Sequence, residues 1–149
     1  MFQRILIAWD GSRVALRALD VALDVARRYD AELVAASVAY SPAHAETEED
    51  RAESAQAARR HLQGTFSDVR DRADRIGVPI EHVIIDGDHP GEDLLAYAHE
   101  HGFDLIVAGH HRSTRAGRLL LHGVPERLVA AAEVPVLIVG DQAGAARGL

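Results

Sequence analysis

The sequence of 149 residues contains neither cysteine nor lysine, and each absence excludes whole classes of chemistry. Without cysteine the chain has no disulfide, no thiolate nucleophile and no cysteine-ligated zinc or iron–sulfur site. Without lysine it has no Walker A phosphate loop, no lysine Schiff base and no protein-kinase lysine. The dinucleotide fingerprint GxGxxG and the nucleophile elbow GxSxG are also missing. P-loop NTPases and protein kinases are therefore excluded.

Long apolar runs and an excess of positive charge are also lacking. No run approaches the ~20 apolar residues of a membrane span, and the N-terminal run is too short for a signal peptide. The formal net charge of -7 argues against general binding to nucleic acid or anionic membranes. We therefore expect a soluble cytoplasmic protein with no nucleic acid and no membrane among its partners.

Apolar runs alternate with helical patterns along the chain. The predicted strands cover residues 4–9, 33–38, 83–85, 104–108 and 134–139, and helical patterns fill the intervals. Because these runs are continuous rather than alternating, they indicate strands buried on both faces of a parallel sheet. We predict a single-domain α/β protein over residues 1–140, with an open five-stranded parallel sheet, helices on both faces and a mobile tail at 141–149.

A cationic loop is the clearest local exception to the acidic charge. Between Gly109 and Val124 the sequence carries three arginines, three histidines and no acidic residue. This loop joins the fourth predicted strand to the last predicted helix, and a helix N-terminus attracts anions. Ligands of such sheets bind beyond the C-terminal strand ends where the strand order reverses, which points to Asp10 and Gly109. The pattern therefore predicts a phosphate site in this loop.

Three stretches together resemble the universal stress protein family over residues 2–139. They are RILIAWDGS, DGDHPGEDLLAYAHEHGFDLIVAGHH and RLLLHGVPERLVAAAEVPVLIV. The resemblance implies an adenine-nucleotide alpha-hydrolase-like fold with strand order 3-2-1-4-5. It also implies a stress-response protein that acts as a regulatory or binding module.

The nucleotide motif of this family is only partly present. Nucleotide-binding members carry Gly, two residues, Gly, nine residues, then Gly and Ser or Thr. Counted without gaps, Gly109 fills the first position, whereas Arg112, His122 and Gly123 depart from the other three. The resemblance therefore implies the branch with weak or absent ATP binding. The alternative is an ATP-binding member with slow hydrolysis, in which Arg112 replaces glycine without blocking the phosphates.

The candidate ligand residues combine the cationic loop with the family resemblance. Asp10 either hydrogen-bonds a ribose or adenine edge or caps the first helix together with Ser12. Val38 falls where the family offers backbone groups to adenine. The three arginines of the loop either pair with phosphates or form a solvated face. The candidate set for ATP or another adenine nucleotide is Asp10, Val38, Gly109, His111, Arg112, Gly123 and Val124.

Metal binding and hydrolysis find little support in the sequence. His110 and His111 are adjacent on a strand end and point apart, and His99 and His101 do not share a helix face. A triad of serine, histidine and aspartate can be assembled only on paper, because the nucleophile elbow is missing. We expect no metal site and no catalytic residue, with slow ATP hydrolysis as the most activity the chain would show.

The last predicted strand points to a second subunit. By resemblance this strand lies at a sheet edge, where an apolar run without gatekeeping charge is a liability unless it is covered. Pairing with the same strand of a second copy would cover it and give a two-fold homodimer. The residues that we expect at this interface are Val136, Leu137, Ile138 and Val139.

Overall fold

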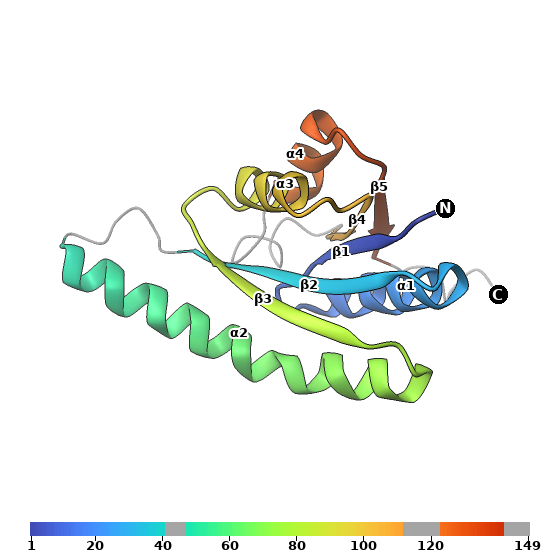
Figure 1. Ribbon diagram of the computed structural model, residues 1–149. Helices are drawn as coiled ribbons and strands as arrows, with labels where there is room; N and C mark the ends of the chain where they lie inside the picture. Colours follow the sequence, from blue (N-terminus) through green and yellow to red (C-terminus); the bar gives the residue numbers. More distant parts are fainter. Residues whose placement is uncertain (41–46, 112–122, 142–149) are drawn as a thin grey trace.

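A computed structural model describes residues 1–40, 47–111 and 123–141 of the chain. Strands and helices alternate along these residues (Figure 1). The strands are β1 (Arg4–Ala8), β2 (Glu32–Ala39), β3 (Ile80–Asp86), β4 (Leu105–His110) and β5 (Val136–Gly140). The helices are α1 (Arg13–Tyr29), α2 (Glu48–Ile76), α3 (Pro90–Glu100) and α4 (Val124–Ala131). The predicted tail is described only at Asp141; its remaining residues, 142–149, lie outside the described part.

The five strands form one parallel sheet in the order β3-β2-β1-β4-β5. β1 lies at the centre, where Ile7 is in register with Ala35 of β2 on one side and Val107 of β4 on the other. β3 and β5 form the two edges. The predicted fold class and strand order are therefore confirmed.

The helices cover the sheet in two layers. α1 and α2 lie over one face, and α3 and α4 lie over the opposite face (Figure 1). Residues of β1 contribute side chains to both layers in turn, because successive side chains of a strand point to opposite faces. Ile5 and Ile7 belong to the cluster that includes the buried side of α1, whereas Leu6 and Ala8 pack with residues of α3 and α4. The core is thus split by the sheet into two apolar layers.

The prediction that every strand is buried on both faces is wrong for the two edge strands. β1 and β2 are buried almost throughout, but most residues of β3 and β5 are only half-buried or exposed. An edge strand has one neighbour instead of two, so solvent reaches it from the open side. In the described part of the chain, no helix is long and apolar enough to cross a membrane.

Local sequence signals set the starts of the helices on the α1/α2 face. The hydroxyl of Ser12 accepts the backbone N–H of Ala15 at 3.2 Å and caps α1. The hydroxyl of Thr47 caps α2 in the same way through Asp50, at 3.1 Å. Capping by Ser12 puts the N-terminus of α1 directly after the end of β1, which fixes where the candidate site begins.

Candidate functional site

The ends of β1 and β4 lie side by side where the strand order reverses. The chain leaves β1 into α1 on one face of the sheet, whereas α4, the helix that follows β4, packs on the other face. Connections that diverge in this way leave room between the two strand ends, and α/β proteins bind ligands there. Asp10 follows β1, and Gly109 and His110 are the last residues of β4.

Asp10 is almost fully buried, with 6 % of its surface exposed. Its Oδ1 accepts the backbone N–H of Ser12 at 2.9 Å, which closes a turn before α1. Ser12 itself caps the helix, so Asp10 supports the cap rather than forming it. Among the described residues, no hydrogen bond is made to Oδ2 of Asp10. One carboxylate oxygen thus holds the turn, and the other is left to accept a hydrogen bond from a ligand.

Val38 lies beside this turn on β2. The last backbone contact between β1 and β2 is the N–H of Trp9, which donates to the carbonyl of Ala36 at 2.9 Å. Backbone groups two residues apart in a strand point the same way, so the N–H and C=O of Val38 also point toward the β1 side. β1 has already ended at that height. Val38 therefore presents one donor and one acceptor beyond the end of β1.

Gly109 has a packing reason to be glycine. A Cβ built on it would lie 2.8 Å from the carbonyl oxygen of Val14 in the first turn of α1. Real Cβ atoms essentially never approach a backbone atom so closely, so a side chain here would push α1 away from β4. The match of Gly109 to the first motif position therefore does not by itself indicate a ligand.

Gly123 and Val124 begin α4. Gly123 is the N-cap residue with φ of +81°, a conformation that favours glycine, and no side chain caps this helix. The first backbone bond of the helix runs from the N–H of Arg127 to the carbonyl of Gly123, at 3.0 Å. The side chain of Val124 is buried in the apolar layer. Gly123 and the helix start thus offer backbone groups, whereas Val124 offers no side chain to a ligand.

The histidines at the end of β4 have different surroundings. Nε2 of His110 lies 3.0 Å from Oε1 of Glu126, an interaction that ties the end of β4 to the first turn of α4. His111 is half-buried and is the last residue before the undescribed segment. Arg112 and the rest of the predicted cationic loop, up to residue 122, lie outside the described residues.

The sequence of the chain matches a known protein family and several of its members. The sequence profile of the universal stress protein family matches residues 1–140. The chain belongs to the universal stress protein family. A universal stress protein of Methanocaldococcus jannaschii is 32% identical over 141 residues, which cover 93% of this chain and 82% of that protein. The family resemblance seen in the sequence is thereby confirmed.

Solved structures of universal stress proteins share this fold. A family member from Burkholderia pseudomallei superposes with a TM-score of 0.73 at 29% identity, covering 93% of this chain and 96% of that one. A universal stress protein solved in complex with cAMP gives a TM-score of 0.68 at 26% identity, covering 93% and 97% of the two chains.

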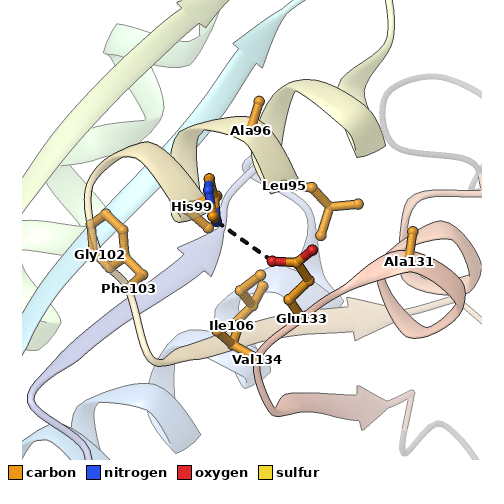
Figure 2. A pocket seen from close by; sticks show the side chains of 10 residues that line it. Leu95, Ala96, His99, Gly102, Phe103, Ile106, Ala131, Glu133 and Val134 are labelled. Atoms are coloured by element: carbon orange, nitrogen blue, oxygen red, sulfur yellow. Dashed lines mark ion pairs between the residues drawn. The ribbon is translucent and has the colours of Figure 1, made fainter.

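Figure 2 shows a pocket of this universal stress protein that is separate from the predicted site. Its volume is about 520 Å³. It opens between the C-terminal parts of α3 and α4, near Ile106 at the beginning of β4. Nδ1 of His99 lies 3.6 Å from Oε2 of Glu133 there, and both side chains are largely exposed. None of the residues predicted to bind nucleotide is among those described as lining this pocket. The pocket and the predicted site occupy opposite ends of β4.

Thr65 of α2 contacts the turn around Asp10, a contact that the sequence did not reveal. Its Oγ1 accepts the indole N–H of Trp9 at 2.9 Å and donates to the carbonyl of Leu62 at 2.6 Å. Its methyl group lies 2.7 Å from the place where a Cβ on Gly11 would be. Thr65 therefore touches the residues on both sides of Asp10. The contact joins residues 56 positions apart, so no local sequence pattern could have indicated it.

A second polar contact, part-buried, lies under α2. Nε2 of His82 on β3 is 2.8 Å from Oγ of Ser37 on β2, and the imidazole stacks on the ring of Phe66 at 4.6 Å between centroids. Burial lowers the pKa of His82 from its ordinary value of 6.5. Arg70 lies over the Phe66 ring at 5.3 Å. The neutral imidazole thus forms part of the packing contact between α2 and the sheet.

Proposed function

We propose that this universal stress protein is a regulatory binding protein that holds an adenine nucleotide weakly between the ends of β1, β2 and β4. The proposal rests on the presence of both Asp10 and Val38 at these strand ends. Asp10 keeps one carboxylate oxygen without a partner among the described residues, and Val38 presents backbone N–H and C=O beyond the end of β1. The cAMP complex of a relative at 26% identity supports an adenine nucleotide as the ligand.

The chemistry of the two residues suits the base and the sugar. An adenine edge carries one acceptor nitrogen beside the amino donor, which is the complement of a backbone N–H beside a C=O. A carboxylate oxygen accepts from a ribose hydroxyl and forms the stronger, charge-assisted kind of hydrogen bond. Val38 therefore recognises the base and Asp10 the ribose. Val38 is held by β2 and Asp10 by the hydrogen-bonded turn before α1, so little ordering is needed when the ligand binds.

The phosphate end is weaker, which sets the expected preference. Glycine allows backbone N–H groups to approach a phosphate closely, but Arg112 and His122 stand where the family motif has glycine. Arginines of the loop add attraction, although a steric block removes several backbone hydrogen bonds at once. We therefore expect ATP to bind with Kd no better than about 100 μM, equivalent to about -5.5 kcal/mol.

Calorimetric titration with cAMP, AMP and ATP tests this function directly. We expect the monophosphates to bind, Asp10→Asn to weaken them about tenfold, and Asp68→Asn on exposed α2 to bind as the wild type does. Emission of Trp9, the only tryptophan, should barely respond to ATP at micromolar concentration. No binding of any adenine nucleotide would contradict the proposal.

Removing the expected obstruction provides the second arm of the experiment. The double variant Arg112→Gly, His122→Gly should bind ATP more tightly than the wild type if the missing glycines limit affinity. Tight ATP binding by the wild type, accompanied by slow phosphate release, would instead support the ATP-hydrolysing alternative. A double variant that binds ATP no better would show that these positions are not the obstruction.

We also propose that the protein is a homodimer through β5. β5 is an edge strand of the sheet, and Leu137 on it is 37 % exposed. Val129 on the adjacent α4 is more exposed still. An apolar edge of this kind is covered when the same strand of a second copy pairs with it, and identical patches meet across a two-fold axis.

A further inference from the structure

We propose that Thr65 is a positioning residue for the nucleotide site: it holds the turn that carries Asp10 in place, and so couples helix α2 to ligand binding. This inference rests on the proposed function, because it assumes that the ligand binds at Asp10. Thr65 itself lies on α2 and contacts the indole of Trp9 and the turn at Gly11. It acts on the site through these two residues.

The hydrogen bond to Trp9 is the first half of this coupling. Trp9 is 1 % exposed, so its indole N–H has no access to bulk water. Oγ1 of Thr65 accepts this N–H at 2.9 Å and donates its own proton to the carbonyl of Leu62 at 2.6 Å. A buried donor that loses its acceptor carries a desolvation penalty, so removing the hydroxyl forces Trp9 or α2 to move.

The contact with Gly11 is the second half. Gly11 has φ of +79°, and the methyl carbon of Thr65 lies 2.7 Å from the position of a Cβ at this residue. α2 therefore packs directly on the backbone of the turn, and only glycine leaves the room for it. A shift of α2 at Thr65 is transmitted to Gly11 without any side chain in between to absorb it.

The two contacts bracket Asp10 along the chain. Trp9 precedes it and Gly11 follows it, so one side chain of α2 contacts the indole of Trp9 and the backbone of Gly11, the residues on either side of the buried carboxylate. Oδ1 of Asp10 is committed to the N–H of Ser12 in the same turn. Displacement of either neighbour therefore changes where Oδ2 points, and small displacements of a binding group weaken affinity strongly.

Two substitutions at Thr65 separate the hydroxyl from the shape. Thr65→Val keeps the branched shape and the methyl against Gly11 but removes the acceptor for Trp9. Thr65→Ser keeps the acceptor. Ala73→Gly weakens the same helix eight residues further on, at a buried position in the last two turns, and serves as the control for a general loss of helix stability. All variants are compared at a temperature where circular dichroism shows them folded.

Three measurements are made on each variant: AMP affinity by calorimetry, the emission maximum of Trp9, and the amide resonances of Gly11 and Ser12 by NMR. We expect Thr65→Val to bind AMP about three- to tenfold more weakly, with shifted Trp9 emission and displaced amide resonances. Thr65→Ser keeps the acceptor but loses the methyl against Gly11, so it should keep the Trp9 emission, displace the Gly11 resonance and lose less AMP affinity than Thr65→Val. Ala73→Gly should lower thermal stability without changing any of the three measurements.

Several outcomes would overturn the proposal. Wild-type AMP affinity in Thr65→Val would do so, and so would an equal loss of affinity in Ala73→Gly, which would indicate a stability effect only. If the wild type binds no AMP, the proposed function fails, and the amide resonances alone decide about Thr65. If the amide resonances of Gly11 and Ser12 do not move in Thr65→Val, the proposal that Thr65 positions this turn is refuted. Displaced resonances would support it.

Discussion

Replacing Gly109 with alanine is expected to destabilise the protein through packing alone. The new Cβ would lie 2.8 Å from the carbonyl oxygen of Val14 and 3.0 Å from both its carbonyl carbon and Cγ1. Two of these three atoms belong to the backbone of α1, so they cannot turn aside as the end of a flexible side chain would. Relief requires the whole helix to move away from β4, or β4 to bend.

The magnitude follows from what α1 loses when it moves. Its inner side contributes a continuous row of buried residues to one apolar layer, so even a small shift loosens many contacts at once. Overpacking in well-packed cores typically costs about 1–3 kcal/mol. For a domain of this size, each kcal/mol lowers the melting temperature by about 2–4 °C. We therefore expect Gly109→Ala to melt about 2–12 °C below the wild type.

Gly140→Ala is the matched control. Gly140 ends β5 in register with His110, one residue beyond Gly109 in the same ladder, and no atom lies within 4 Å of the place that a Cβ on it would take. This change should be neutral or slightly stabilising, because alanine restricts the unfolded chain. Calorimetry and urea unfolding of both variants measure the difference. Equal stability of the two variants would refute the packing argument for Gly109, and loss of nucleotide binding without loss of stability would show that the glycine serves the ligand instead.

Two further predictions concern stability and assembly. Because burial lowers the pKa of His82, the folded protein binds fewer protons here than the unfolded chain, so this residue makes stability fall as pH drops below 6.5. Urea midpoints at about pH 7.5 and about pH 5.5 should show this fall in the wild type and a smaller one in His82→Phe, and an equal fall in both would contradict it. Leu137→Arg should yield monomer or aggregate in sedimentation, while the same change at the exposed Tyr29 leaves a dimer. An unchanged dimer in Leu137→Arg would disprove pairing through β5.

Much of the fold could be predicted because its signals are local. Continuous apolar runs identified the strands, and Ser12 marked a helix start that the structure confirms. The strand order came from the family resemblance rather than from any local pattern. The partial exposure of β3 could not be predicted from its sequence, because Val83, Ile84 and Ile85 resemble the residues of a central strand. Only its place at the sheet edge explains the difference.

The candidate site was predictable only in part, for a different physical reason. The chain position of Asp10 after a buried strand indicated where the candidate site would lie. The role of Thr65 depends on how α2 packs against the turn that follows β1, and the contact of Ser37 with His82 depends on the register of β2 and β3. Both are consequences of how whole elements pack, so side chains far apart in sequence meet without leaving a sequence pattern. The close approach of Gly109 to the backbone of Val14 likewise depends on how α1 packs on β4, so the sequence could not indicate it.

The two ends of the proposed site differ in how much they depend on side chains, and this difference explains the expected ligand preference. Val38 contributes backbone groups whose direction is fixed by the sheet, and the Asp10 turn is clamped by Ser12 and Thr65. This base and sugar end does not use the motif positions that Arg112 and His122 occupy. The phosphate end relies on glycines, and a motif that lacks them loses affinity with each added phosphate while keeping the base. A chain with these departures should therefore discriminate against ATP more than against AMP, so the ratio of the two affinities reports on the motif more directly than either affinity alone.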